Sequence, residues 1–151
     1  MQQVDVIVVG AGSAGATVAA RLSEDSSRRV LLIEAGQDTA PGAVPSDIRS
    51  IFPAAYINRD YFWPGFAASL RQGEPPVPFL QPRVMGGGSS VMGMIALRGL
   101  PTDYDGWERM GARNWGWQNV LPTFQAMTND LDEPTPSRNV RGPNVVRRLP
   151  R

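Results

Sequence analysis

Two glycine-rich segments contain the residues of this 151-residue chain best suited to bind a ligand. The first, GAGSAG, starts at Gly10. The second is the triple glycine of residues 86–88, which follows the cation of Arg83 and precedes Ser89 and Ser90. Glycine has no Cβ, so a ligand can approach the backbone closely, and hydroxyl and guanidinium groups donate hydrogen bonds to anionic oxygens. We therefore predict that the two segments hold one dinucleotide cofactor from two sides.

The first segment has the surroundings that a dinucleotide-binding turn requires. A β-branched apolar run from Val4 to Val9 predicts a buried parallel strand, and an alanine-rich helix follows the turn. Gly10 permits the tight turn, Gly12 lets a pyrophosphate touch the backbone, and Gly15 lets helix and strand pack closely. The free N–H groups and the positive dipole at the helix start favour phosphate there.

An acidic residue follows the second predicted strand, at the position where a dinucleotide-binding fold has an acid that binds the ribose. The second apolar run, Val30 to Ile33, ends at Glu34, 19 residues after Gly15. A carboxylate at this place accepts hydrogen bonds from ribose hydroxyls and repels a 2′-phosphate. The structural alternatives are a tight turn without a ligand and a surface acid at a strand end. The order of strand, glycines, helix, strand and acid favours the binding site.

The same sequence lacks the residues of most catalytic centres. It contains no histidine and no cysteine, which excludes a Ser-His-Asp triad, a thiolate nucleophile and metal sites with these ligands within the chain. Its acids Asp103, Asp105 and Glu108 are expected at the start of a helix rather than as an acid–base pair. We expect no catalytic residue and no metal site here, only a cofactor-binding segment.

The amino-acid composition limits the classes of molecule that this chain is expected to bind. A 42% hydrophobic content fits one globular domain, and a net charge of +1 gives no electrostatic reason to expect nucleic acid or an anionic membrane. A basic cluster near the end is expected to be a solvated face or a segment that awaits a partner; it comprises Arg138, Arg141, Arg147, Arg148 and Arg151. No apolar run reaches the ~18 residues of a membrane span. The first strand starts almost at Met1, so we expect no signal peptide and a cytoplasmic location.

Between the two glycine segments the chain is rich in proline and aromatic residues. Ser46 to Ile57 predicts a short helix that Pro53 interrupts. The aromatic group of residues 61–66, which includes Trp63, either packs in the core or wraps around a planar ligand.

Further on, we predict a helix from Pro101 to near Gly111 with Thr102 as its cap, and a second helix after Trp117. A short strand is expected over Val145 to Leu149. Two clear parallel strands are fewer than the five or six, roughly, of a complete dinucleotide domain, so we expect the chain to be part of a larger fold.

These motifs resemble the N-terminal portion of the glucose–methanol–choline (GMC) oxidoreductases, a family of FAD enzymes. The GxGxxG and the EAG of residues 34–36 resemble the opening of the family. Residues 83–107, RVMGGGSSVMGMIALRGLPTDYDGW, resemble its first signature, and residues 111–124, GARNWGWQNVLPTF, resemble the segment that follows. The triple glycine with two serines is most similar to the hydroxymethylfurfural-oxidase type, near the choline-dehydrogenase-like members, which oxidise alcohols.

The resemblance implies an α/β fold, namely a Rossmann-like FAD-binding domain of GMC type that is incomplete in this chain. Residues 1–36 would form its βαβ FAD-binding unit and residues 37–82 an excursion rich in proline and aromatic residues. Residues 83–128 would supply the signature loop and two helices. Residues 129–151 would form a polar loop and a short strand that lead into a substrate domain outside this sequence.

The resemblance also assigns the cofactor contacts. The first motif would cradle the FAD pyrophosphate, Glu34 would bind the adenosine ribose, and the signature loop would line the pyrophosphate and the isoalloxazine. The implied FAD-binding residues are Gly10, Gly12, Ser13, Ala14, Gly15, Glu34, Ala35, Trp63, Arg83, Val84, Gly88, Ser89, Met92, Gly93 and Met94. The substrate would be a small alcohol. The catalytic histidine of the family belongs to its C-terminal portion, so the remainder of the enzyme is the implied partner.

The chain departs from the family pattern at three places. Met92 stands where asparagine is usual, residues 122–128 lack the usual lysine and glutamate, and residues 138–143 lack a histidine. Two alternatives stay open beside the alcohol oxidoreductase. One is a truncated relative that binds FAD without catalysis, a pseudoenzyme. The other is a non-redox enzyme on the same scaffold, such as a hydroxynitrile lyase or a flavin photoenzyme.

Overall fold

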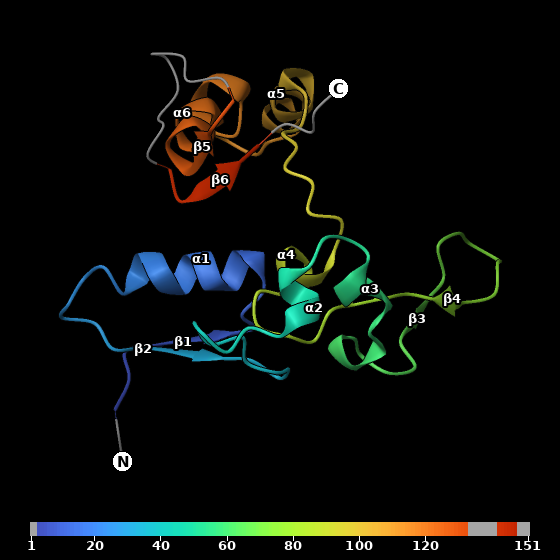
Figure 1. The fold of residues 1–151 in the computed structure, drawn as a ribbon. Coiled ribbons are helices and arrows are strands. Elements are labelled where there is room, and N and C mark those ends of the chain that lie inside the picture. The colour runs from blue at the N-terminus through green and yellow to red at the C-terminus, as the bar shows by residue number, and fades with distance from the viewer. Residues whose placement is uncertain (1–2, 133–141, 148–151) are drawn as a thin grey trace. The chain divides into compact units, whose positions relative to one another are not determined.

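A computed structural model describes residues 3–132 and 142–147 of the chain. The chain divides into two compact units, residues 1–94 and residues 95–151, and each is described by itself. The first unit contains both helices and strands, and its first three elements alternate as expected for an α/β protein (Figure 1). The four sequence segments proposed above stay a prediction, because compactness alone does not assign roles to them.

A βαβ unit opens the first unit, as predicted. Strand β1 (Val6–Val9) pairs in parallel with β2 (Val30–Ile33), with Val6 beside Val30 and Val9 beside Ile33. Helix α1 (Ser13–Leu22) joins them and contacts both strands. Its alanines are small enough for close packing, and Ala19 is buried. The β-branched strands and the alanine-rich helix thus place the glycine turn at the carboxyl end of β1.

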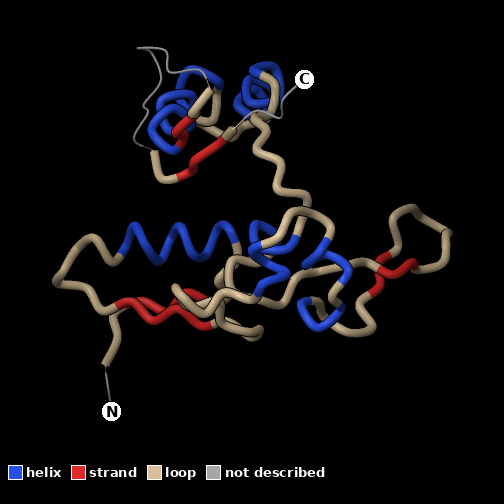
Figure 2. The backbone as a smooth tube through the Cα atoms, viewed as in Figure 1, coloured by secondary structure: helices blue, strands red, loops and turns tan. Residues whose placement is uncertain are grey.

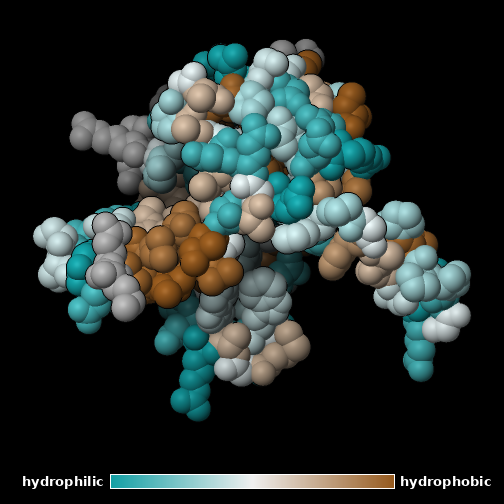
Figure 3. All heavy atoms as spheres, turned by 90° about the horizontal axis from the view of Figure 1, so that it is seen from below, coloured by the Kyte–Doolittle hydropathy of each residue, from teal (hydrophilic) through white to brown (hydrophobic). Residues whose placement is uncertain are grey.

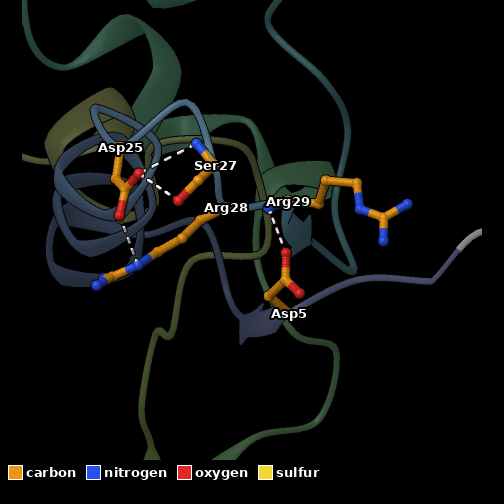
Figure 4. Close-up of polar contacts among 5 residues, drawn as sticks. All are labelled: Asp5, Asp25, Ser27, Arg28 and Arg29. Carbon is orange, nitrogen blue, oxygen red and sulfur yellow. Dashed lines mark hydrogen bonds and ion pairs between the residues drawn. The ribbon is translucent and has the colours of Figure 1, made fainter.

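Polar contacts close the connection between α1 and β2 (Figure 4). Asp25 accepts hydrogen bonds from the backbone N–H and the hydroxyl of Ser27, at 3.1 and 2.6 Å, and these bonds lower the pKa of its carboxyl. The guanidinium of Arg28 lies 3.0 Å from the other Asp25 oxygen. Asp5 accepts a 2.7 Å bond from the backbone N–H of Arg29, which extends the strand pairing beyond the ladder. The bond between Asp5 and Arg29 thus joins the start of β2 to the start of β1.

One face of this small sheet is apolar and exposed. Side chains alternate along both strands, so every second residue lies on the face opposite α1. The exposed set is Ile7 (56%), Val9 (80%), Leu31 (42%) and Ile33 (45%). Seen from below, the same region forms a continuous hydrophobic patch (Figure 3). A contiguous apolar patch of this kind marks a surface that another part of a protein covers.

The excursion after β2 consists mostly of loops and very short elements (Figure 2). These are α2 (Ser46–Arg49), α3 (Ala54–Ile57), the 3-10 helix η1 (Arg59–Tyr61), β3 (Ala67–Ala68) and β4 (Val77–Pro78). The predicted interruption at Pro53 is confirmed, since α2 and α3 flank it. A hydrophobic core joins this excursion to the signature loop; it comprises Ala55, Tyr61, Phe62, Val84 and Val91. The excursion therefore supports the second glycine motif.

A partly buried polar network holds the excursion together. Asp47 accepts hydrogen bonds from the side-chain amide of Asn58 and from the phenol of Tyr61, each at 2.9 Å. The bond from Asn58 is the main cause that lowers the pKa of Asp47. Burial and then the bond to Asp47 raise the pKa of Tyr61 to about 12. The folded state thus favours the charged form of Asp47 and the neutral form of Tyr61.

We expect this network to weaken in alkali. A raised pKa in the fold means that Tyr61 stabilises the protein below pH ~10, the ordinary tyrosine value, and that this contribution is lost as the pH rises through 12. All 15 basic residues are arginines, so tyrosines are the side chains that titrate in this range. Between pH 9 and 11, urea unfolding should show a loss on the order of 1 kcal/mol, which Tyr61→Phe removes. An equal loss in Tyr61→Phe and in Tyr56→Phe would contradict this assignment.

The second unit pairs two helices with two short strands. Helices α5 (Pro101–Arg109) and α6 (Trp117–Met127) pack around Tyr104, whose ring lies 5.2 to 5.6 Å from those of Trp107, Trp117 and Phe124. Strand β5 (Thr128–Asp130) pairs in parallel with β6 (Asn144–Val146). Both predicted helices are confirmed.

The helix cap and the last strand differ from their predictions. Leu100 caps α5, because Asp103 accepts a 2.9 Å bond from the Leu100 N–H; Thr102 lies inside the helix, so its prediction as the cap was wrong. The predicted strand over Val145 to Leu149 begins one residue earlier and ends at Val146 within the described part, and Leu149 lies outside it. The basic residues Arg138, Arg141, Arg148 and Arg151 also lie outside the described residues. Within residues 3–132 and 142–147, no helix has both the length and the apolar character to cross a membrane.

Candidate functional site

The turn after β1 shows why glycine stands at three of its positions. Gly10 adopts φ +91°, where other residues are strained, and its N–H donates a 2.7 Å bond to the Ile33 carbonyl. A Cβ on Gly15 would lie 1.9 Å from the carbonyl oxygen of Gly10, so only glycine lets α1 approach the turn. A Cβ on Gly12 would meet nothing within 4 Å. Neither the turn nor the packing therefore requires glycine at position 12, and the open space where its Cβ would lie is available to a ligand.

The second glycine motif lies directly against the first. The Gly86 N–H donates a 2.8 Å bond to the Ala11 carbonyl, and a Cβ on Gly87 would lie 2.9 Å from the Gly12 Cα. Both contacts join residues more than 70 positions apart in the sequence. The prediction that the two motifs serve one site requires this proximity, and the structure provides it.

A second contact lies at the end of β2. A Cβ on Gly36 would come within 2.1 Å of the Arg83 carbonyl, and the Met85 N–H donates a 2.9 Å bond to the Gln37 carbonyl. The signature loop thus crosses the carboxyl ends of both parallel strands. In open α/β sheets, ligands bind at this edge.

Glu34 connects the ends of the two strands. One of its carboxylate oxygens accepts a 2.7 Å bond from the Ala11 N–H, and the other accepts a 2.9 Å bond from the Gly36 N–H. A carboxylate oxygen can accept more than one hydrogen bond, so both oxygens still have capacity for a ribose hydroxyl. The backbone bonds hold the carboxylate in place before any ligand arrives. Ala35, next in the chain, is exposed.

Replacing Glu34 by glutamine should weaken this connection. The amide keeps one acceptor oxygen but turns its NH2 group toward an N–H donor, so one of the two backbone bonds is lost. We expect Glu34→Gln to lower the free energy of unfolding by about 1–2 kcal/mol and to weaken FAD binding as well. Urea unfolding and flavin titration measure the two effects. Glu24→Gln, which changes an exposed acid in an ion pair with Arg21, is the matched control; an equal loss there would contradict the role of Glu34.

Arg83 presents an unsatisfied donor within the site. Its Nε is buried and makes no hydrogen bond, although buried polar groups in folded proteins nearly always find a partner. The guanidinium carbon lies 5.4 Å from the centre of the Trp63 ring, and the Arg83 backbone N–H bonds to the Tyr61 carbonyl. Trp63 itself is 44% exposed, so it is not a core residue. The pair is suited to a ligand that supplies an acceptor for the guanidinium.

The signature loop ends in a one-turn helix, α4 (Gly88–Val91). The hydroxyls of Ser89 and Ser90 donate hydrogen bonds within their own loop: Ser89 to the Gly86 carbonyl at 2.6 Å, and Ser90 to the Met85 carbonyl at 2.8 Å. Val84 is buried in the core, so only its backbone can face a ligand. These contacts make the loop rigid.

The three residues after α4 differ in burial and in backbone conformation. Met92 caps α4 and packs partly against the hydrophobic core, so the thioether that replaces the usual asparagine is held by apolar neighbours. Gly93 is half-buried, whereas Met94 is 69% exposed and adopts φ +55°. In the first motif, Ser13 and Ala14 are exposed at the start of α1. All predicted site residues therefore belong to the first unit.

The sequence profile of the family described as GMC oxidoreductase matches residues 4–147, nearly the whole chain. The chain belongs to the GMC oxidoreductase family. The resemblance drawn from the two glycine motifs is thereby confirmed.

Individual GMC relatives agree with this assignment. The 5-(hydroxymethyl)furfural oxidase of Methylovorus sp. (strain MP688) is 41% identical over 137 residues, which cover 85% of this chain and 26% of that protein. The crystal structure of pyridoxine 4-oxidase from Mesorbium loti superposes with a TM-score of 0.77 at 36% identity and covers 95% of this chain and 28% of the other. An FAD-dependent oxidoreductase from Chaetomium thermophilum gives a TM-score of 0.67 at 33% identity, with 85% and 21% covered. The chain spans about a quarter of the length of the curated relatives it matches.

GMC membership identifies the cofactor as FAD, and the predicted α/β, Rossmann-like fold is confirmed as an incomplete FAD-binding domain. The geometry fits this cofactor. The space over Gly12, the helix start at Ser13 and the free donor of Arg83 suit an anionic pyrophosphate. Sequence reasoning missed Gly36 as the residue that lets the signature loop approach the end of β2 at Arg83. The EAG of residues 34–36 contains this glycine, but its local pattern does not reveal the distant contact.

Proposed function

We propose that this chain is the FAD-binding part of an oxidoreductase that oxidises the CH–OH group of a small alcohol. The observation that carries the proposal is the contact between the two glycine motifs, Gly86 to Ala11 and Gly87 to Gly12, which forms one cradle from segments far apart in sequence. FAD, when bound, accepts the hydride from the alcohol carbon. The residues of this chain hold and orient the cofactor and perform no step of the chemistry themselves.

Each part of the proposed cradle has its own task. The turn of Gly10, Gly12, Ser13, Ala14 and Gly15 would bind the pyrophosphate through backbone N–H groups at the start of α1. Glu34 and Ala35 would bind the adenosine ribose. Arg83, with Val84 and Trp63, would supply a cation and a flat ring at the far side, while Gly88, Ser89, Met92, Gly93 and Met94 would line the flavin. The hydrogen bonds of Ser89 and Ser90 support the proposed role of the signature loop. A pre-organised loop loses little entropy when the cofactor binds.

The remainder of the proposed enzyme has two tasks. It would cover the apolar sheet face of Ile7, Val9, Leu31 and Ile33, and it would supply the base that removes the hydroxyl proton. The second task follows from composition, since the sequence contains no histidine. A cytoplasmic location, expected from the sequence, is part of the proposal, and fractionation of cells that produce the protein tests it.

The test is anaerobic reduction of the flavin by an alcohol. In the complete protein that carries this segment, benzyl alcohol should bleach the absorption band near ~450 nm as the aldehyde appears in equal amount. A flavin that stays oxidised while a cyanohydrin releases cyanide would instead indicate a lyase. Bound flavin without either reaction would indicate a relative that binds FAD without catalysis. The lack of histidine in these 151 residues is consistent with that alternative as well.

A further inference from the structure

An open cleft of about 880 Å³ lies within the first unit, beside the signature loop. Aromatic and aliphatic side chains from the excursion form most of its wall, and α4 forms another part of it. Its walls include Tyr56, Arg59, Phe79, Leu80, Gly88 and Met92. A volume of this size is typical of a site for a small organic ligand, in the range of roughly 300–1,000 Å³.

The position of the cleft relates it to the proposed flavin site. Gly88 and Met92 are the first residue and the C-cap of α4, and both border the cleft. They are also among the residues proposed to line the flavin. A molecule in the cleft therefore lies next to the part of the chain where an alcohol must meet the cofactor.

The walls of the cleft select for flat apolar groups. The Tyr56 ring is fixed by a perpendicular contact with Phe62, 5.9 Å between centres, and Phe79 packs at 6.5 Å against Phe66. Leu80 packs against the hydrophobic core. Rings held in this way offer faces and edges to an aromatic ligand at little entropic cost.

Arg59 adds a positive charge to this apolar wall. It is exposed, at the start of η1, and among the described residues its guanidinium forms no ion pair; the acid next to it, Asp60, is not paired with it either. A guanidinium beside aromatic rings binds a carboxylate through two parallel N–H bonds, which is stronger than a bond between neutral groups. Charge complementarity thus favours an anionic ligand.

We propose that the cleft binds an aryl alcohol that carries a carboxylate, with the ring against Tyr56 and Phe79 and the carboxylate on Arg59. The proposal names the substrate class of the proposed oxidoreductase and rests on that function. It places the specificity for the anionic group on Arg59, outside the residues proposed to hold FAD.

Binding of a substrate analogue without a hydroxyl group tests the cleft independently of turnover. In the complete FAD-loaded protein, calorimetric titration with 4-methylbenzoate should show affinity that Arg59→Ala lowers about 10-fold and that Arg59→Lys lowers less. Arg71→Ala, which removes an exposed arginine paired with Glu74 outside the cleft, should bind as the unchanged protein does. No binding of 4-methylbenzoate, or equal binding by Arg59→Ala, would overturn the proposal. So would a loss of FAD instead of the analogue in Arg59→Ala, because the cleft would then belong to the cofactor.

Turnover separates this proposal from the function on which it rests. The ratio of kcat/KM for 4-(hydroxymethyl)benzoate to that for 4-methylbenzyl alcohol should fall about 10-fold in Arg59→Ala. An unchanged ratio, with flavin reduced by both alcohols, would overturn the cleft proposal and leave the oxidoreductase intact. If neither alcohol reduces the flavin, the proposed function fails, and the titration with 4-methylbenzoate still decides whether Arg59 binds the carboxylate.

Discussion

Replacing Gly12 by alanine should lower the affinity for FAD by about 100-fold while the protein without cofactor keeps its stability. A new Cβ at this position meets no atom within 4 Å, and Gly12 has φ −69° and ψ −175°, a conformation that alanine adopts without strain. The fold therefore accommodates the methyl group. The proposed position of the pyrophosphate uses the same space, and overfilling a packed contact costs roughly 1–3 kcal/mol. Flavin fluorescence titration gives the affinity, and thermal unfolding of the FAD-free protein gives the stability.

Gly106→Ala is the matched control for this measurement. Gly106 lies in α5, its new Cβ would meet only the Arg109 guanidinium at 3.7 Å, and it is remote in sequence from both glycine motifs. It should leave FAD affinity unchanged. If Gly12→Ala binds FAD as tightly as Gly106→Ala does, the proposed pyrophosphate position is wrong.

Replacing Gly15 by alanine should instead damage the fold itself. The new Cβ would lie 1.9 Å from the Gly10 carbonyl oxygen and 3.1 Å from its carbonyl carbon, and backbone atoms of a tight turn cannot move away without separating α1 from β1. We expect the free energy of unfolding to fall by about 3 kcal/mol, as in severe overpacking. Urea unfolding of the FAD-free protein measures it.

The direction of the stability change in Gly15→Ala is informative, because helix propensity alone predicts that alanine stabilises the protein at this position. Gly15 and Gly106 are both inside helices, where alanine is favoured over glycine by about 1 kcal/mol. Gly106→Ala should therefore stabilise the protein slightly, whereas Gly15→Ala destabilises it. Stabilisation by both substitutions would mean that the close approach of α1 to the turn is absent in solution.

The sequence predicted the parts of the site that depend on local order. The βαβ unit, the roles of Gly10 and Gly15 and the position of Glu34 all follow from spacing along a short stretch of chain, and the structure agrees with each. The interruption at Pro53 follows in the same way from the missing N–H and fixed φ of proline.

Contacts between segments far apart in the sequence could not be predicted from local spacing. Nothing in the local pattern says that Gly36 meets the Arg83 carbonyl, since that contact depends on how the whole excursion folds back across the strand ends. The two backbone bonds of Glu34 were missed for the same reason. The cap of α5 was assigned to Thr102 by residue type, but the helix starts at Pro101, which places the cap two residues earlier, at Leu100, with Asp103 as its partner.

Hydrogen–deuterium exchange with and without FAD tests most directly whether both glycine motifs hold one cofactor. In the complete protein, FAD should slow exchange in residues 10–16 and in residues 84–92 together, at the same FAD concentration. Residues 67–77, which contain most of the β3–β4 pair and none of the residues proposed to hold FAD, should exchange at the same rate in both samples. Protection of residues 10–16 alone would contradict the shared cradle, because the signature loop would then touch the first motif without touching the ligand.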